Sequence, residues 1–560
     1  MLHFIDFEVF KKDWLCVIIN PQRKSEWVIV NDPAKLKAYY DRYKNEIFVG
    51  FNIRHYDQFI FKGILLGFNP KDVNDWIVVQ DKMGWEFSNL FRNVNINVFD
   101  CMTSFHGLKT LEGFMGNDVR ESGVNFEIDR KLTDSEIQET IKYCRHDVQQ
   151  TMQVFLKRKE EFDAHMGMLK AFNLPLSYIS KTKIQLSAAA LGAISQRRDD
   201  EFDLEYPHTL KLSKYEHIKR WYDDKNNRDY EKSLNIDVAG VPHIFAWGGL
   251  HGARPNFIET GRFLNVDVAS YYPSLMIKYG WGSRNISDPK KYEEIYHQRL
   301  KYKAEKNPLQ APLKIVLNGT YGAMKDQYNP LYDPRQANNV CVGGQLLLLD
   351  LIEKLEDHCD IVQSNTDGIL VKLRDNREQV EEICHEWEHR TGMVLEFDEF
   401  VKVIQRDVNN YIIVDEKGSY KSKGAVVKKQ NSLDYDMSII NDAVVNYFVK
   451  GIPVETTINE CNDLIKFQKI VKVSRKYNHA LHGDKRLNEK TLRVFASNNP
   501  NDGGVFKVKL GKNPEKFANT STNCFIVNGD VKGVSVPDKL DRSFYIDLAK
   551  KGIDSFVGTK

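Results

Sequence analysis

The sequence predicts an α+β protein of several domains. With 560 residues, of which 42% are apolar and 28% charged, the chain is long enough for roughly three or four separate cores. Strand-like and helical patterns are mixed along it: residues 4–10 alternate as in a strand, residues 134–157 have helical spacing, and residues 359–373 fit a β-hairpin with Asp367-Gly368 at its turn. Neither type of pattern dominates, so we expect an α+β fold.

Composition argues against several classes of protein. The eight cysteines contain no CxxC pair, which indicates neither a zinc site nor a disulfide framework. No apolar run reaches the roughly 18 residues of a membrane helix, and the first ten residues fit a strand rather than a targeting segment. We therefore expect a cytoplasmic protein without membrane contact.

The charge is distributed unevenly. The formal net charge is only +2, but between Val401 and Lys560 the Lys and Arg residues exceed the Asp and Glu residues by nine, so the remainder is net acidic. A basic region can bind phosphates while acidic pockets elsewhere bind metal. A solvated charged surface is the alternative explanation.

Acidic residues recur at defined places in the first 150 residues. Asp6 and Glu8 share one face of the predicted first strand, where two carboxylates repel each other unless a cation lies between them. Asp57 stands five residues beyond Asn52, after a buried-looking strand. The predicted helix 134–157 carries Tyr143 and Asp147 at i and i+4, hence on one face.

A second acidic pair spans the middle of the chain. Asp267 ends a predicted strand, and Asp367 lies in the hairpin turn about a hundred residues later. Between them, two predicted helices carry polar side chains on shared faces, at Arg299, Lys303, Lys314, Asn318 and Tyr321. Two carboxylates opposite a cationic helix face are what a pair of divalent metals and a nucleoside triphosphate require.

The N-terminal motifs DxE, NxxxYD and YxxxD, in this order, resemble the three exonuclease motifs of family B DNA polymerases. The resemblance implies a ribonuclease H-like domain in which four carboxylates bind two divalent metals and Tyr143 orients the attacking water. The implied ligands are Asp6, Glu8, Asp57 and Asp147. Asn52 would contact a single-stranded 3′ end, with capping of the following helix as the alternative.

Three further segments resemble the polymerase motifs of the same family: DVASYYPS, KIVLNGTYG and SNTDG. The resemblance implies that Asp267, the Val268 carbonyl and Asp367 bind two metals and that Tyr272 packs beneath the sugar and selects deoxyribonucleotides. Nucleotide binding falls to Arg299, Lys303, Lys314, Asn318 and Tyr321. The sequence departs from the family pattern at three positions, where Tyr271 replaces leucine, Gly319 replaces serine and Asn365 replaces aspartate.

DNA contacts are implied by weaker matches. FAWGGLHG resembles a YxGG motif that touches the template strand, and DVNNYIIV resembles a KxY motif that contacts primer-template, with Asn409 in place of the lysine. Together with Asn52, the implied DNA-binding residues are Trp247, Gly248, Gly249, Gly322, Tyr411, Lys421 and Lys423. We also expect Gly368 to let the primer approach closely.

The resemblance covers nearly the whole chain and implies a right-hand polymerase joined to the exonuclease domain. The expected domains are 1–165 exonuclease, 166–235 helical connector, 236–279 palm, 280–340 short fingers, 341–428 palm and 429–560 thumb. The expected partners are primer-template DNA, deoxynucleoside triphosphates, two Mg²⁺ per site with Mn²⁺ as a substitute, and single-strand-binding or other replisome proteins. We expect a monomer of the compact bacteriophage or mobile-element type, in the host cytoplasm if phage-encoded.

Two alternatives remain open. Asn365, at the position of an aspartate in the family, suggests a DNA-binding 3′→5′ exonuclease whose polymerase half is impaired. A non-catalytic replication or packaging scaffold is the second alternative, but it leaves the six motifs unexplained.

Overall fold

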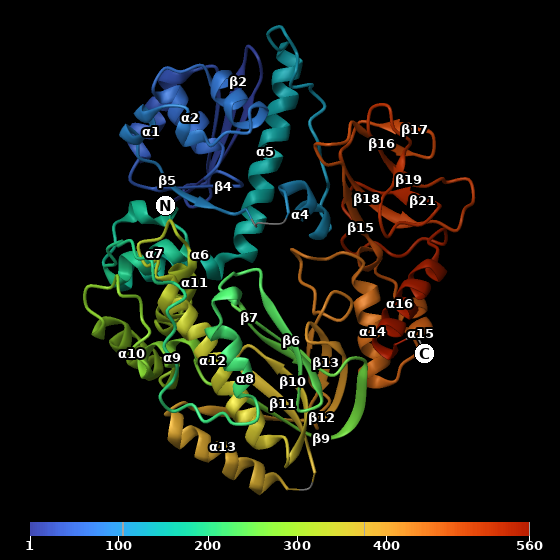
Figure 1. The fold of residues 1–560 in the computed structure, drawn as a ribbon. Coiled ribbons are helices and arrows are strands. Elements are labelled where there is room, and N and C mark those ends of the chain that lie inside the picture. Colours follow the sequence, from blue (N-terminus) through green and yellow to red (C-terminus); the bar gives the residue numbers. More distant parts are fainter. Residues whose placement is uncertain (103–105, 375, 559–560) are drawn as a thin grey trace. The chain divides into compact units, whose positions relative to one another are not determined.

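The computed structural model describes residues 1–102, 106–374 and 376–558. The chain forms two compact units, each built from three stretches of sequence. The first unit consists of residues 1–181, 430–439 and 459–545, and the second of residues 182–429, 440–458 and 546–560. Both contain helices and sheets (Figure 1), which confirms the predicted α+β multidomain class. Within the described residues no helix is both long and apolar enough to cross a membrane.

The first unit contains a five-stranded sheet in the order β3-β2-β1-β4-β5. Strand β1 is antiparallel to β2 and parallel to β4, as expected of a ribonuclease H-like sheet. The strands are β1 (Leu2–Val9), β2 (Trp14–Asn20), β3 (Ser25–Val30), β4 (Ile47–Gly50) and β5 (Asn97–Asp100). The helices are α1 (Pro33–Tyr43), α2 (Asp57–Leu65), α3 (Pro70–Asn74), α4 (Leu108–Phe114), α5 (Asp134–Lys157) and α6 (Lys159–Ala171).

Side-chain alternation gives β1 two different faces. Ile5 and Phe7 belong to a core that includes residues of α1 and α2. Phe4 points to the other side and contacts Phe155 of α5, with ring centroids 5.3 Å apart. The predicted acidic pair of β1 has the same parity as Phe4 and therefore faces α5, which begins and ends at the predicted residues.

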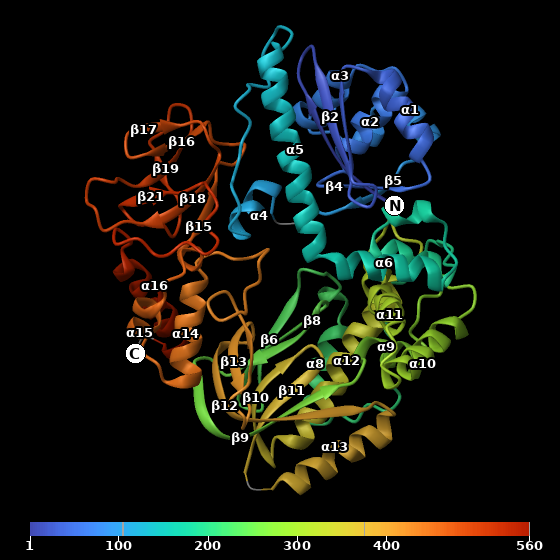
Figure 2. The ribbon, with the colours of Figure 1, turned by 180° about the vertical axis from the view of Figure 1, so that it is seen from behind.

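The C-terminal part of the first unit contains two small sheets, β15-β18-β21 and β17-β16-β19-β20. Helix α4 contacts β15 and β18 although more than 350 residues separate them in the sequence, and both views show α4 beside the first small sheet (Figures 1 and 2). The strands are β15 (Lys469–Lys472), β16 (His479–His482), β17 (Lys485–Leu487), β18 (Thr491–Ala496), β19 (Val505–Val508), β20 (Glu515–Lys516) and β21 (Cys524–Ile526).

The second unit is built on a nine-stranded sheet in the order β14-β13-β12-β9-β11-β10-β8-β7-β6. Strand β9 lies inside the sheet, where it pairs antiparallel with both β11 and β12. The strands are β6 (Ser233–Val238), β7 (Val241–Ala246), β8 (Gly249–Ala253), β9 (Phe257–Val268), β10 (Cys359–Asn365), β11 (Gly368–Leu373), β12 (Leu395–Asp407), β13 (Asn410–Val414) and β14 (Tyr420–Lys423).

Helices of the second unit pack against this sheet and against one another. Helix α12 contacts β8, β10 and β11, and α13 packs on α12 (Figure 2). Helix α11 lies between α7 and α10, both of which contact it. The helices are α7 (Lys183–Leu191), α8 (Glu216–Asp223), α9 (Tyr271–Lys278), α10 (Lys290–Ala304), α11 (Gln310–Lys325), α12 (Pro334–Leu355) and α13 (Arg377–Thr391). Helices α14 (Ser438–Lys450), α15 (Val454–Glu460) and α16 (Arg542–Val557) contribute residues to both units.

Candidate active sites

Four carboxylates of the first unit lie together. Asp6 and Glu8 project from β1, Asp57 is the first residue of α2, and Asp147 lies on α5. The backbone N–H of Phe7 donates to Oδ1 of Asp57 at 3.2 Å, which fixes that carboxylate beside β1. The structure thus brings all four residues together, and their role as metal ligands stays a prediction.

Burial makes negative charge costly in this cluster. It is the main reason why the pKa values of Asp6 and Glu8 lie well above the usual range, and the neighbouring carboxylates raise both pKa values further. Burial also raises the pKa of Asp57 to about 7 and that of Asp147 to about 6. Oxygen ligands that repel one another in a buried site fit a hard divalent cation, so these residues suit the metals that the motifs imply.

Helix α4 brings a cation to the cluster that the motifs do not include. The Lys109 ammonium forms ion pairs with Asp147 and with Glu112, whose Oε1 lies 3.1 Å from Nζ. The same ammonium lies 4.7 Å from the centre of the Tyr143 ring. Glu112 is fully buried, and its Oε2 lies 3.6 Å from Nε2 of His146. No sequence pattern signals these contacts, because Lys109 and Asp147 lie on different helices.

Two further residues of the first unit, Cys144 and Asn52, also bear on this site. The Cys144 thiol donates to the Asp6 carbonyl at 3.4 Å, and its sulfur lies with the Asp6 and Glu8 oxygens in a group of potential ligand atoms. Asn52 has a left-handed backbone (φ 64°), and the cap position of α2 is Tyr56. The capping role for Asn52 is therefore not found, while its proposed DNA contact stays a prediction.

In the second unit, the two predicted catalytic aspartates belong to neighbouring strands: Asp267 lies on β9, and Asp367 lies in the turn that precedes β11. Asp267 of β9 pairs in register with Gly368 of β11, next to Asp367 in the turn. The backbone N–H of Val268 donates to the Asp367 carbonyl at 2.8 Å, and the Asn265 amide donates to Oδ2 of Asp267 at 2.7 Å. Burial, followed by repulsion from Asp367, raises the pKa of Asp267 to about 6. Burial also raises the pKa of Asp367.

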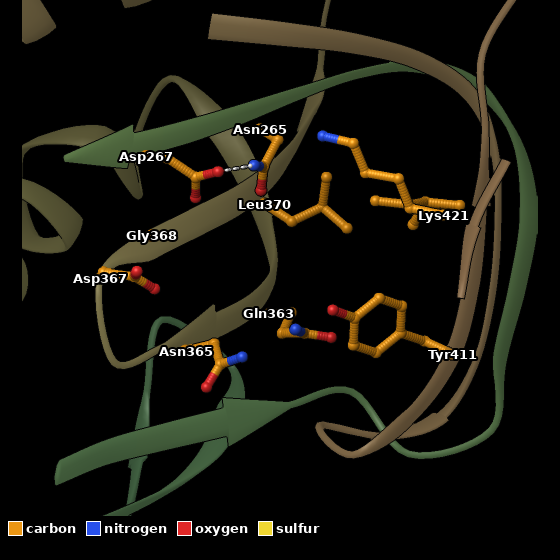
Figure 3. A pocket seen from close by; sticks show the side chains of 10 residues that line it. Asn265, Asp267, Gln363, Asn365, Asp367, Gly368, Leu370, Tyr411 and Lys421 are labelled. Carbon is orange, nitrogen blue, oxygen red and sulfur yellow. Dashed lines mark hydrogen bonds between the residues drawn. The ribbon is translucent and has the colours of Figure 1, made fainter. Parts of the chain in front are cut away.

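A cavity of about 160 Å³ opens beside these aspartates (Figure 3). Tyr411 of β13 and Lys421 of β14 face the aspartates across it, and Asn365 lines it as well. Lys423 lies opposite Tyr411 in the β13-β14 pairing and is exposed. The structure therefore gathers three of the predicted DNA-binding residues near the aspartates.

A larger cavity of about 570 Å³ lies on the other side of Asp367, which lines both cavities. It is bounded by the N-terminal end of α9 and by one face each of α10 and α11. Its lining includes every predicted nucleotide-binding residue together with Val268 and Gly322: Arg299, Lys303, Lys314, Asn318, Tyr272 and Tyr321. Glu396, which pairs with Asp267 across β12 and β9, also lines it and was missed from the sequence.

The cavity walls are held by side-chain contacts. The Arg299 guanidinium donates to Oγ of Ser270 at 3.3 Å, and its buried Nε has no hydrogen-bond partner among the described residues. Rings of Tyr272 and Tyr321 stack with centroids 4.1 Å apart and planes inclined by 20°. A buried guanidinium with a free N–H, next to two exposed lysines, is suited to bind a polyanion.

The glycine at position 319, where the family has serine, lies where α11 packs against α7. A Cβ atom on Gly319 would lie 2.7 Å from Oγ of Ser187, whose hydroxyl donates to the Lys183 carbonyl at 2.9 Å. A side chain at position 319 would therefore require the Ser187 hydroxyl to turn away from that carbonyl. The substitution leaves the cavity-lining residues of α11 unchanged.

The glycine pair after Trp247 forms the tight turn between β7 and β8, in which Ala246 pairs with Gly249. Gly249 has φ 152°, which favours glycine. The Trp247 indole is 1% exposed, donates to the Asn227 carbonyl at 3.0 Å and packs against Phe202. Its side chain is thus a core element rather than a DNA contact, and only Gly248 and Gly249 keep that expectation.

Comparisons with known proteins point to one class of enzyme. DNA polymerase 1 of Saccharolobus solfataricus is 26% identical over an alignment of 335 residues that covers 50% of this chain and 36% of that protein. DNA polymerase 1 of Aeropyrum pernix is 22% identical over an alignment of 297 residues that covers 46% of this chain and 29% of that protein. The chain thus spans only about a third of the length of these curated relatives. No protein-family profile matches the chain.

Among solved structures, the family B DNA polymerase of Pyrobaculum calidifontis aligns with all of this chain and 78% of its own, at 14% identity and a TM-score of 0.44. The chain is thus similar in sequence to curated DNA polymerases, and its motifs resemble those of family B. The compact bacteriophage type stays a prediction.

Proposed function

We propose that the protein is a DNA-directed DNA polymerase with a 3′→5′ proofreading exonuclease. The observation that carries this proposal is the cavity of about 570 Å³ that is lined by Asp367 together with Arg299, Lys303 and Lys314. A deoxynucleoside triphosphate has the size and charge for such a cavity, and its substrate partner would be the 3′ end of a primer on a template. The DNA polymerase relatives support the same assignment.

In polymerisation, Asp267, Asp367 and the Val268 carbonyl would hold two Mg²⁺ ions, for which Mn²⁺ can substitute. When bound, the two metals lower the pKa of the primer 3′-hydroxyl and neutralise charge on the phosphates. The cations of α10 and α11 would bind the triphosphate and stabilise the departing pyrophosphate. Tyr272, stacked on Tyr321, would support the sugar and disfavour a 2′-hydroxyl.

In proofreading, the cluster of the first unit would hydrolyse the terminal phosphodiester. Asp6, Glu8, Asp57 and Asp147 would hold two metals, and Tyr143 would orient the water. Lys109 already pairs with Asp147, so it would limit the repulsion among the carboxylates before metal binds. Asn52 would contact the single-stranded end that reaches this site.

The proposed partners are primer-template DNA and deoxynucleotides, with replisome proteins as further candidates. Tyr411, Lys421, Lys423, Gly248, Gly249 and Gly322 are the proposed DNA contacts. The same proposal includes the division of the chain into exonuclease, connector, palm, short fingers and thumb, at the boundaries expected from the sequence.

Primer extension tests the proposal. The purified Asp6→Ala variant, which should not degrade its primer, is incubated with a primed single strand, Mg²⁺ and four deoxynucleotides. Template-directed extension is expected with this variant and with the wild type. Absence of extension in both, with primer degradation by the wild type, would instead favour a nuclease with an impaired polymerase half.

A further inference from the structure

Helix α4 connects two parts of the first unit that are far apart in the sequence. One side of α4 carries Lys109 and Glu112, which contact Asp147 of the nuclease cluster. Gly113, one turn after Lys109, approaches β15 so closely that a Cβ atom on it would lie 2.7 Å from Cδ1 of Ile470. The helix therefore contacts both α5, which carries Asp147, and strands β15 and β18 of the small sheet.

Arg493 of β18 binds the end of α4. Its side chain is fully buried, and Nη2 donates to the carbonyl of Gly113 at 3.2 Å and to that of Asn117 at 2.6 Å. Nε donates to Oε1 of Gln468 at 2.9 Å. One guanidinium group thus joins the last turn of α4 to the residues that follow the helix. Arg493 therefore anchors the C-terminal end of α4 to β18.

Hydrogen bonds of Asn117 and Glu121 extend the contact that Arg493 makes with α4. The Asn117 amide donates to Oε1 of Gln150 at 2.6 Å, and Gln150 lies on α5 within one turn of Asp147. Further along, the Glu121 carboxylate accepts from the backbone N–H groups of Lys490 and Thr491 at 2.8 and 2.7 Å. These bonds connect residues 459–545 to both helices that carry nuclease residues.

We propose that residues 459–545 are a positioning element of the nuclease site, in which Arg493 holds α4 so that Lys109 stays on Asp147. This inference rests on the proposed nuclease function. Arg493 lies in the α4 contact and touches none of the four carboxylates among its hydrogen bonds, so it is a positioning residue that acts through Lys109.

A double-mutant cycle tests this route. Lys109→Met should lower the nuclease rate at saturating DNA by about 10- to 100-fold, as is usual for groups that support metal ligands. Arg493→Lys should lower it about tenfold by the same reasoning. Because Arg493 acts through Lys109, the nuclease rate of the double variant should lie within about twofold of that of Lys109→Met alone. Additive losses would overturn the inference.

Two controls separate positioning from unfolding. Arg486→Lys changes an exposed arginine of β17 in the same segment and should leave the nuclease rate unchanged. If Arg493→Lys does not fold, Glu121→Gln replaces it in the cycle, because it weakens the same contact without changing a buried cation. Its loss of nuclease rate should likewise be non-additive with that of Lys109→Met. Primer extension by each variant should stay within about twofold of the wild-type rate, because the residues proposed for polymerisation belong to the second unit.

Hydrogen exchange without metal gives a readout that needs no turnover. Amides of residues 108–114 should exchange faster in Arg493→Lys than in wild type or Arg486→Lys, since α4 loses its anchor. Unchanged exchange there would overturn the inference even if activity falls. A wild type that binds and extends primers but degrades none would contradict the proposed nuclease itself, and this positioning role with it.

Discussion

A Cβ atom on Gly368 would lie 1.9 Å from Oδ1 of Asp267, so the Asp267 carboxylate occupies the space that any other residue at position 368 would fill. The two residues are partners in the β9-β11 pairing. Glycine is therefore required here by the proposed metal ligand of the same unit. The sequence alone suggests that this glycine makes room for the primer, and the contact with Asp267 supplies a more direct reason.

Gly368→Ala should abolish DNA synthesis with little effect on the nuclease. The new methyl group must displace Asp267, and a misplacement of about 1 Å commonly lowers a rate about 100-fold. Single-nucleotide incorporation and primer degradation, measured on the same preparation, would show the difference. Wild-type incorporation by this variant would mean that the Asp267 carboxylate has another position during catalysis.

Lys303→Met should weaken nucleotide binding. Lys303 lines the large cavity, whereas Lys301 lies two residues earlier on the same helix and does not, which makes Lys301→Met a matched control. Loss of a charge-assisted contact to a phosphate should raise KM for deoxynucleotides about tenfold, and the control should leave KM unchanged. Steady-state incorporation across a range of nucleotide concentrations measures both. Equal effects of the two substitutions would remove Lys303 from the nucleotide site.

Asn365→Asp should change the rate of synthesis by less than about tenfold. Asn365 lines the small cavity with both catalytic aspartates, and a third carboxylate there would add repulsion without replacing either proposed ligand. Pre-steady-state incorporation is the relevant measurement. If synthesis rose from near zero to a substantial rate, the natural site would be impaired and the nuclease alternative would gain support.

The metal-free protein should become less stable as pH rises. Burial raises the pKa of Asp57 to about 7 and that of Asp147 to about 6, while unfolded aspartate titrates near 3.9. These groups therefore favour the folded state fully below about pH 4, and this contribution is lost as pH rises through 6 to 7. Thermal unfolding in chelator should give a lower Tm at pH 8 than at pH 5, with a smaller difference in Asp57→Asn.

Added Mg²⁺ should restore Tm at pH 8, because bound cations offset the repulsion among the carboxylates. A Tm in chelator that rises with pH over this range would show that the cluster is not the dominant titrating group.

Local patterns predicted much of the fold. The hairpin of β10 and β11 turns at Asp367-Gly368 as expected, and α5 matches its predicted residues because Thr133 and Glu136 form a capping box at its start. Helical periodicity alone predicts which polar side chains of α10 and α11 share a face, whereas nucleotide binding by that face comes from the motif resemblance and stays a prediction. The structure brings these side chains to one cavity.

Contacts between distant segments were not predictable in this way. Lys109 reaches Asp147 from a short helix with no motif of its own, and Arg493 meets α4 across more than 370 residues. Trp247 was assigned to a DNA surface because it precedes two glycines, yet its indole fills a core formed with residues far from it in sequence. Each depends on tertiary packing that periodicity does not encode.

The most direct test of two separate active sites on one chain is a comparison of Asp367→Ala with Asp6→Ala in the same primer-template assay. We predict that Asp367→Ala degrades the primer and does not extend it, whereas Asp6→Ala extends the primer and does not degrade it. Extension by Asp367→Ala at the wild-type rate would contradict the account.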